Sequence, residues 1–214
     1  MKTPEHPIFI ESIKYIRSKL GNTGLTKVQQ SILERIIHSS GDFSLQSYLK
    51  FSPYACDKAI DSLKKGATIL TDTFMAESAI SPMAKRTLKS DVQCILEMAP
   101  NSIDAGLTTR SSICMRSKWL DFEKKDKFSE PPIVVIGSAP TALMTLLDLI
   151  DQGSKIPSLV IGMPVGFIGV TESKLRLLRS KCSYIILNGS RGGASIASAT
   201  INALLRAADC ENQD

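Results

Sequence analysis

Two histidines, His6 and His38, are the imidazole groups of the chain, and His6 falls in the expected N-terminal tail. His38 ends a helix-like segment, residues 27–38, whose apolar residues cluster on one side at about 100° per residue. His38 falls opposite this apolar stripe, and Arg35 lies beside it on the expected helix. A histidine that holds or releases a proton near neutrality suits general acid catalysis. The alternative is a histidine that only stabilises the helix C-terminus through the helix dipole.

Three turns rich in glycine or proline are candidate anion sites: residues 137–141, 162–167 and 188–193. Each opens a helix-like segment, and helix N-termini offer free N–H groups to phosphates or carboxylates. Arg191 adds a guanidinium that binds carboxylates through two hydrogen bonds. Tight turns need glycine in any case, so each turn also fits a purely structural role. None matches the G-x-G-x-x-G or G-x-x-x-x-G-K-[ST] pattern, which disfavours a standard NAD or ATP site.

Two further polar positions are Thr71, which ends an apolar run, and Arg110, at the expected first turn of another helix. Asp72 or Asp104 could pair with Arg110 in an ordinary salt bridge, so the pattern leaves the role of Arg110 open.

The elements that position these residues alternate along the chain. Continuous, often β-branched runs are typical of strands buried on both faces of a parallel sheet. Helix-like segments follow the last three runs, so the order predicts a doubly wound α/β sheet with ligands at the carboxyl ends of the strands. The five apolar runs are residues 67–71, 92–97, 133–137, 159–162 and 184–187, and the helix-like segments are 142–151, 173–179 and 195–208.

The first 66 residues predict three helices instead, 9–20, 27–38 and 53–65, separated by glycines. We therefore expect a single domain over residues 1–214, with a helical lead-in over 1–66 and an α/β core over 67–210. The charged segment 117–132 is predicted to be a mobile surface loop or a helix end.

The composition excludes several classes of protein. Charged residues make up 22% and hydrophobic residues 43%, as in ordinary soluble domains rather than disordered or collagen-like chains. The net charge of +5 is mild and aromatic residues are only 6%, which argues against a nucleic-acid partner. No apolar stretch reaches the ~20 residues that cross a membrane, and the N-terminus lacks the apolar run of a signal peptide. We expect a cytoplasmic protein without a membrane partner.

The five cysteines are an odd number and lack C-x-x-C spacing, so reduced thiols are favoured over a zinc ribbon or a disulfide framework. With only two histidines, a His-rich metal site is not expected.

Seven motifs, taken in order along nearly the whole chain, resemble those of precorrin-8X methylmutase, also called precorrin isomerase, a family of cobalamin biosynthesis. They are residues 37–43 (IHSSGDF), 51–53 (FSP), 71–72 (TD), 109–111 (TRS), 139–142 (APTA), 164–167 with 172–174 (PVGF and ESK) and 191–193 (RGG).

The resemblance implies a flavodoxin-like three-layer α/β/α fold with a five-stranded, mainly parallel sheet, and a homodimer. It implies an isomerase that moves a methyl group between adjacent carbons of a corrinoid polycarboxylate, precorrin-8X or cobalt-precorrin-8, giving hydrogenobyrinate or cobyrinate. No external cofactor is implied, and cobalt enters only if the substrate carries it. The sequence leaves open which of the two substrates is used.

The resemblance also assigns roles to individual residues. The essential histidine of the family, thought to protonate the ring system, matches His38. A substrate-contacting serine matches Ser12, on a looser motif, and the arginine that precedes the histidine matches Arg35. Substrate binding is further assigned to Thr71, Arg110, Arg191, Gly192 and Gly193.

A bulky ring also needs an apolar floor, for which Met75, Met163, Val165 and Phe167 are candidates, although each equally fits core packing. Two other functions stay open at this point. One is a methyltransferase or nucleotide-dependent enzyme that uses the glycine turns, and the other is a non-catalytic corrinoid carrier or regulatory domain.

Overall fold

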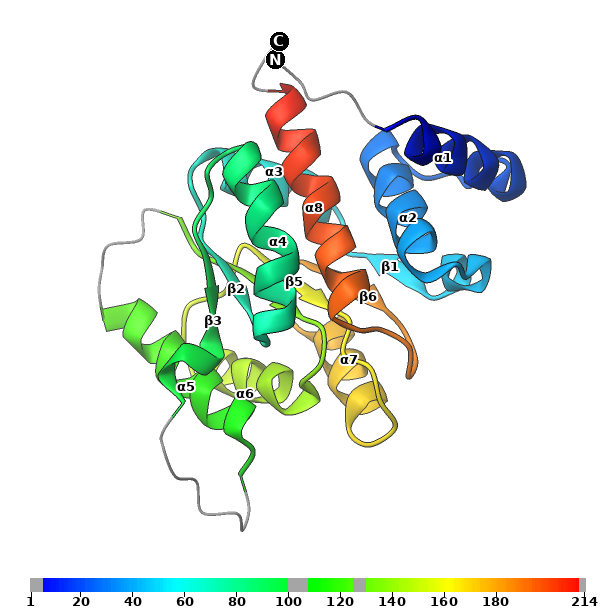
Figure 1. The fold of residues 1–214 in the computed structure, drawn as a ribbon. Helices are drawn as coiled ribbons and strands as arrows, with labels where there is room; N and C mark the ends of the chain where they lie inside the picture. The colour runs from blue at the N-terminus through cyan, green and yellow to red at the C-terminus, as the bar shows by residue number, and fades with distance from the viewer. Residues whose placement is uncertain (1–5, 100–107, 125–129, 212–214) are drawn as a thin grey trace.

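The structure, a computed structural model, describes residues 6–99, 108–124 and 130–211. A six-stranded sheet in the order β1-β6-β5-β4-β2-β3 runs through the centre of this described part (Figure 1). Neighbouring strands from β6 to β3 pair in parallel, and β1 pairs antiparallel with β6. The strands are β1 (Leu49–Phe51), β2 (Ile69–Thr71), β3 (Val92–Cys94), β4 (Ile133–Ile136), β5 (Leu159–Gly162) and β6 (Tyr184–Leu187).

Eight helices cover the two faces of the sheet in the described residues, which confirms the predicted three-layer α/β/α architecture (Figure 1). Helices α1 to α4 and α8 share one apolar core with the sheet, and α5 to α7 share the other. The helices are α1 (Pro7–Leu20), α2 (Lys27–Ser40), α3 (Ala55–Lys64), α4 (Phe74–Arg86), α5 (Arg110–Lys124), α6 (Pro140–Asp151), α7 (Val170–Arg179) and α8 (Ala194–Glu211), with two 3₁₀ helices, η1 (Phe43–Ser47) and η2 (Ile95–Met98).

The central strands show why continuous apolar runs predicted a buried sheet. In β4, Ile133 and Val135 face the core under α8, whereas Val134 and Ile136 face the core under α6. All four side chains are fully buried, so no position of this strand can be polar. The five predicted strands are confirmed in their approximate positions.

The expected count of five strands was one too few, because β1 was missed. β1 has only three residues, of which Leu49 is buried, Lys50 exposed and Phe51 half-buried. Its pairing with β6 joins Leu49 to Leu187, far along the chain. A short edge strand of this kind carries no continuous apolar run, so its sequence alone gives little sign of it.

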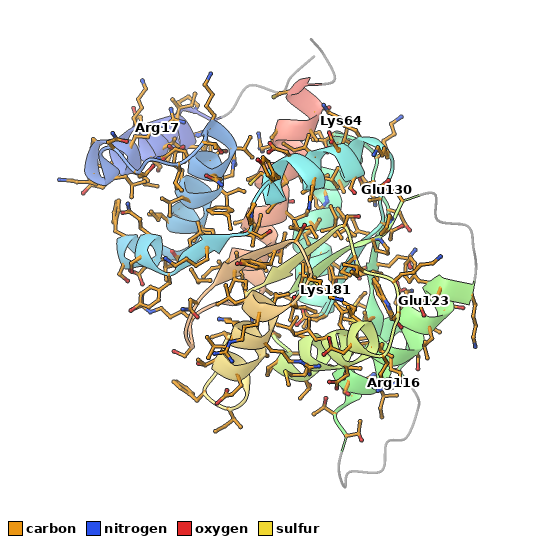
Figure 2. The ribbon with its side chains drawn as sticks, turned by 180° about the vertical axis from the view of Figure 1, so that it is seen from behind. Arg17, Lys64, Arg116, Glu123, Glu130 and Lys181 are labelled. Carbon is orange, nitrogen blue, oxygen red and sulfur yellow. The ribbon has the colours of Figure 1, made fainter. Side chains whose placement is uncertain are left out.

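The three predicted N-terminal helices are confirmed as α1, α2 and α3. The start of α2 is fixed by a capping box, in which Thr26 and Gln29 bond to each other's backbone N–H. Its end is fixed by Gly41, whose φ of 67° is left-handed. Arg17 of α1, labelled in Figure 2, makes a bidentate ion pair with the buried Glu34 of α2, at 2.7 and 2.9 Å.

Helix α4 was not predicted, and its composition explains why: Pro82 lies inside it among alanines and serines. The predicted loop or helix end over 117–132 begins inside α5, where Trp119 and Phe122 are buried. Residues 125–129 of that segment lie outside the described residues.

Across the described ranges, no helix is long and apolar enough to cross a membrane.

Candidate functional site

His38 lies on the last turn of α2 with its side chain exposed, while the preceding Ile36 and Ile37 are buried in the core. The imidazole packs nearly perpendicular to the ring of Phe9 from α1, with ring centroids 5.0 Å apart. The Arg35 guanidinium lies over the same Phe9 ring, at 4.9 Å. Phe9 therefore contacts both polar side chains and holds the imidazole in place without covering it, a contact that the sequence did not reveal.

Ser12 lies on α1, three residues after Phe9, and is half-buried. Residues three apart are neighbours on a helix surface, so Ser12 lies on the side of α1 from which Phe9 contacts His38. The structure thus brings the helices that carry Ser12, Arg35 and His38 together, and the roles that the resemblance assigns to these residues stay predictions.

The chain turns sharply after His38. The Ser40 hydroxyl donates to the Ile36 carbonyl at 2.8 Å and accepts from the Asp42 N–H at 3.2 Å. Asp42 then caps η1 by accepting from the Ser44 N–H at 2.9 Å. The hydrogen bonds from Ser44, together with the charge of Arg191, hold the pKa of Asp42 below its ordinary value. This turn presents a carboxylate four residues after the histidine.

Arg191 follows β6 and reaches this carboxylate. Its Nη1 lies 2.6 Å from Oδ2 of Asp42, and it also donates to the Ser44 hydroxyl. Its guanidinium carbon lies 5.8 Å from the centre of the Tyr48 ring. The Arg191 side chain remains 48% exposed, so it stays accessible to a ligand carboxylate. The turn after β6 and the turn after His38 therefore form one polar surface.

The turns after β5 and β6 are bound to each other through the predicted glycines. A Cβ on Gly192 would lie 2.1 Å from the Met163 carbonyl oxygen, so only glycine fits this approach. The Gly193 N–H donates to the same Met163 oxygen at 2.9 Å, and the Gly166 N–H donates to the Ser190 carbonyl at 3.1 Å. Two backbone hydrogen bonds and one close backbone approach thus hold the two turns together.

The remaining candidate anion site, the turn over residues 137–141, already binds a carboxylate of the chain itself. Asp72, fully buried at the end of β2, accepts hydrogen bonds from the N–H groups of Gly137, Ser138 and Ala139 at 3.0, 2.7 and 2.7 Å. Burial raises the pKa of Asp72, while these three N–H donors oppose that shift. The chain's own carboxylate therefore occupies this turn, which supports the purely structural alternative for it over the role of an anion site.

Thr71 ends β2, and Arg110 begins α5. Thr71 is fully buried, and its hydroxyl donates to the Thr73 carbonyl at 3.1 Å, so it stabilises the turn that places Asp72. Its assignment to substrate contact stays a prediction that this packing does not favour. Arg110 is exposed at the start of α5. Of its two suggested partners, Asp72 is bonded elsewhere and Asp104 lies outside the described residues.

The four candidates for an apolar floor differ in their exposure. Met163 is fully buried and belongs to the core, which leaves no surface for a ligand. Met75, Val165 and Phe167 are exposed, and Phe167 is 92% exposed. An open cavity of about 540 Å³ is lined by Thr23, Leu25 and residues 43–44 and 46–51. Arg191 contacts two of these lining residues, Ser44 and Tyr48.

Lys174 of α7 is a functional candidate that the sequence indicates only as part of the ESK motif. It is fully buried, and its ammonium donates to the carbonyls of Gly189 at 2.8 Å and Arg191 at 2.6 Å. Burial lowers the pKa of Lys174 to about 8. The burial of Lys174 and its hydrogen bonds to the turn that carries Arg191 mark it as a functional candidate. Neither feature could be predicted from the sequence pattern.

The lowered pKa predicts a pH-dependent stability. Between pH 8 and the ordinary lysine pKa of 10.5, the unfolded chain binds more protons at Lys174 than the folded chain. Burial of the charged lysine therefore lowers the free energy of unfolding, and this destabilisation is complete below pH 8. It decreases as the pH rises above 8, because the folded chain then releases the proton. Relative to Lys174→Met, the wild type should gain about 2 kcal/mol in free energy of unfolding between about pH 7.5 and 9.5. Urea denaturation of both proteins at both pH values measures the gain. If the free energy of unfolding changes with pH equally in the two proteins, the prediction is contradicted.

The described residues contain no group of three or more His, Cys, Asp or Glu side chains placed to hold a metal ion. Cys56, Cys94, Cys114 and Cys182 are buried free thiols, and Cys210 is an exposed one.

Known proteins resemble this chain over nearly its whole length. The sequence pattern of the family described as precorrin-8X methylmutase matches residues 7–207. A cobalt-precorrin-8 methylmutase of Synechocystis sp. is 36% identical, over 94% of this chain and 95% of its own. A precorrin-8X methylmutase of Pseudomonas aeruginosa is 33% identical, over 92% and 93%. The crystal structure of a precorrin-8x methyl mutase from Thermus thermophilus superposes with a TM-score of 0.84 at 31% identity, covering 97% of this chain and 98% of that one.

Proposed function

We propose that this chain, which belongs to the precorrin-8X methylmutase family, uses His38 as the proton donor of its reaction. The chain is an isomerase of cobalamin biosynthesis that acts on a corrinoid. The family match does not favour a carrier or a nucleotide-dependent enzyme. The observation that carries the role of His38 is its exposed imidazole, oriented by Phe9 and followed closely by the Asp42–Arg191 surface.

In the proposed step, His38 donates a proton to a pyrroline nitrogen or a conjugated ring position of the corrinoid. Protonation withdraws electron density from the ring and lowers the barrier to methyl migration. The methyl group leaves one ring carbon and bonds to its neighbour, after which the proton returns to His38. Substrate and product have the same composition, so no external cofactor, oxidant or reductant is required.

The polycarboxylate substrate is bound mainly through charge. Arg191 exchanges its contact with Asp42 for a substrate carboxylate, since its guanidinium is half exposed and already aligned. Arg35 and Arg110 supply further positive charge, and the Ser12 hydroxyl supplies a hydrogen bond. The backbone of Gly192 and Gly193 keeps the Arg191 turn close to the turn after β5.

A homodimer is part of this proposal. Phe167 and Ile168 are 92% and 89% exposed, at the turn that follows β5. Two adjacent, large apolar side chains in water are unfavourable, and a second copy of the chain that covers them removes this cost.

We also place the enzyme in the cytoplasm, where its cysteines stay reduced.

Turnover of purified substrate tests this function. Precorrin-8X and cobalt-precorrin-8 are incubated separately with the purified chain, and the product is followed by visible absorption and mass spectrometry. We expect at least one substrate to change its spectrum without a change in mass, and the reactive one identifies the aerobic or anaerobic route. Tight binding of both corrinoids with no conversion of either contradicts the proposed isomerase activity.

A further inference from the structure

Lys174 is a buried charge that the proposed reaction does not use. Its side chain enters the protein from α7 and has no exposed surface. Taking an ammonium out of water is unfavourable, and a methionine of similar size avoids that cost. The ammonium is balanced here by two carbonyl oxygens of one turn, Gly189 at 2.8 Å and Arg191 at 2.6 Å.

We propose that Lys174 is a positioning residue for the isomerase: its ammonium fixes the turn after β6 so that Arg191 meets a carboxylate of the corrinoid. This inference rests on the proposed role of Arg191 in substrate binding. Lys174 itself does not touch the substrate, because it is fully buried.

The backbone of the turn shows how the fixing works. The carbonyls of Gly189 and Arg191 both point to the Lys174 ammonium, while the carbonyl between them, on Ser190, accepts from the Gly166 N–H at 3.1 Å. All three consecutive carbonyls of this turn therefore accept a hydrogen bond, two from Lys174 and one from Gly166. A turn bonded in this way has one conformation, and the direction of the Arg191 side chain follows from it.

The consequence extends to the histidine side of the molecule. Arg191 contacts Asp42, which lies in the turn directly after the helix that carries His38. Lys174 belongs to α7, in the opposite helix layer of the sheet (Figure 1). Through the turn after β6, the lysine thus ties the layer of α7 to the catalytic side, and a shift of this turn moves Arg191 relative to His38.

Three variants separate positioning from a general effect on folding. Lys174→Met removes the donors and keeps the volume, and Lys174→Arg keeps a charged donor. Lys181→Met is the matched control, because Lys181 is exposed just after α7 (Figure 2). Each protein is measured for amide hydrogen exchange at Gly193, whose N–H donates to Met163, and for KM and kcat with the corrinoid substrate.

We expect Lys174→Met to raise both the Gly193 exchange rate and KM by about 10- to 100-fold, the effect of losing charged hydrogen bonds to buried carbonyls. The kcat should change much less, since His38 is untouched. Lys174→Arg should recover part of KM, and Lys181→Met should match the wild type. If Lys174→Met does not fold, Lys174→Gln, which keeps a neutral donor, is measured in the same way with an intermediate rise expected.

Unchanged exchange and unchanged KM in the folded Lys174 variants overturn the proposal. Faster exchange with unchanged KM also overturns it, because the turn then moves without affecting the substrate. A wild-type chain that converts no corrinoid contradicts the proposed function instead. The exchange measurement needs no substrate, so the two failures remain distinct.

Discussion

Replacing His38 by alanine is expected to lower kcat by about 10²- to 10⁴-fold, the range that a positioned proton donor contributes. The loss should fall on turnover rather than on folding, because the imidazole is exposed at the end of α2 and its removal leaves no buried cavity. Binding of the corrinoid should persist, since Arg191 and the exposed apolar residues are unchanged. Steady-state kinetics by visible absorption, with a binding titration of the same variant, measures both quantities.

The second histidine provides the matched control. The His6 Nδ1 accepts a hydrogen bond from the Ile8 N–H at 3.3 Å and so caps α1, a structural role. His6→Ala should keep kcat and weaken α1 slightly. A His38→Ala variant that turns over at the wild-type rate excludes the proton-donor role, whatever its affinity for the corrinoid.

Gly192→Ala is expected to disrupt the site from the backbone. The new Cβ would lie 2.1 Å from the Met163 oxygen and 2.7 Å from the Pro164 oxygen. Neither oxygen belongs to a side chain that can rotate away, so the turns after β5 and β6 must separate. That separation breaks the Gly193 hydrogen bond to Met163 and displaces Arg191. We expect a loss of about 1–3 kcal/mol in free energy of unfolding and a large rise in KM.

Chemical denaturation and substrate kinetics on the same preparation test this expectation. Ser190→Ala is the control, because Ser190 is exposed in the same turn and keeps its backbone carbonyl bond to Gly166. It should retain both stability and KM. A Gly192→Ala protein that is as stable and as active as Ser190→Ala would show that the close approach of the two turns contributes neither to stability nor to substrate binding.

Much of the fold was predictable because its signals are local. Buried parallel strands need apolar side chains on both faces, so β4, β5 and β6 appear as continuous runs in the sequence. The amphipathic pattern of α2 likewise predicts that His38 lies on the surface, where the structure places it. The carboxyl ends of the parallel strands then indicated the glycine turns as the places to look for a ligand site.

The missed features depend on contacts between distant residues. Asp72 fills the N-terminus of α6 across about 65 positions of sequence, and Arg191 pairs with Asp42 across 149. Lysines are usually surface residues, so nothing in the composition near Lys174 indicated its burial. The ordered motifs ESK and RGG were the available signal, and the structure joins them through the hydrogen bond from Lys174 to the Arg191 carbonyl.

The role of His38 as the source of the proton for methyl migration is tested most directly by chemical rescue. A His38→Gly variant, saturated with corrinoid, is assayed with increasing imidazole, which can occupy the exposed space left beside Phe9. We predict that the rate rises with imidazole and follows the concentration of its protonated form. A variant that binds the corrinoid but shows no increase at any imidazole concentration or pH would contradict this role.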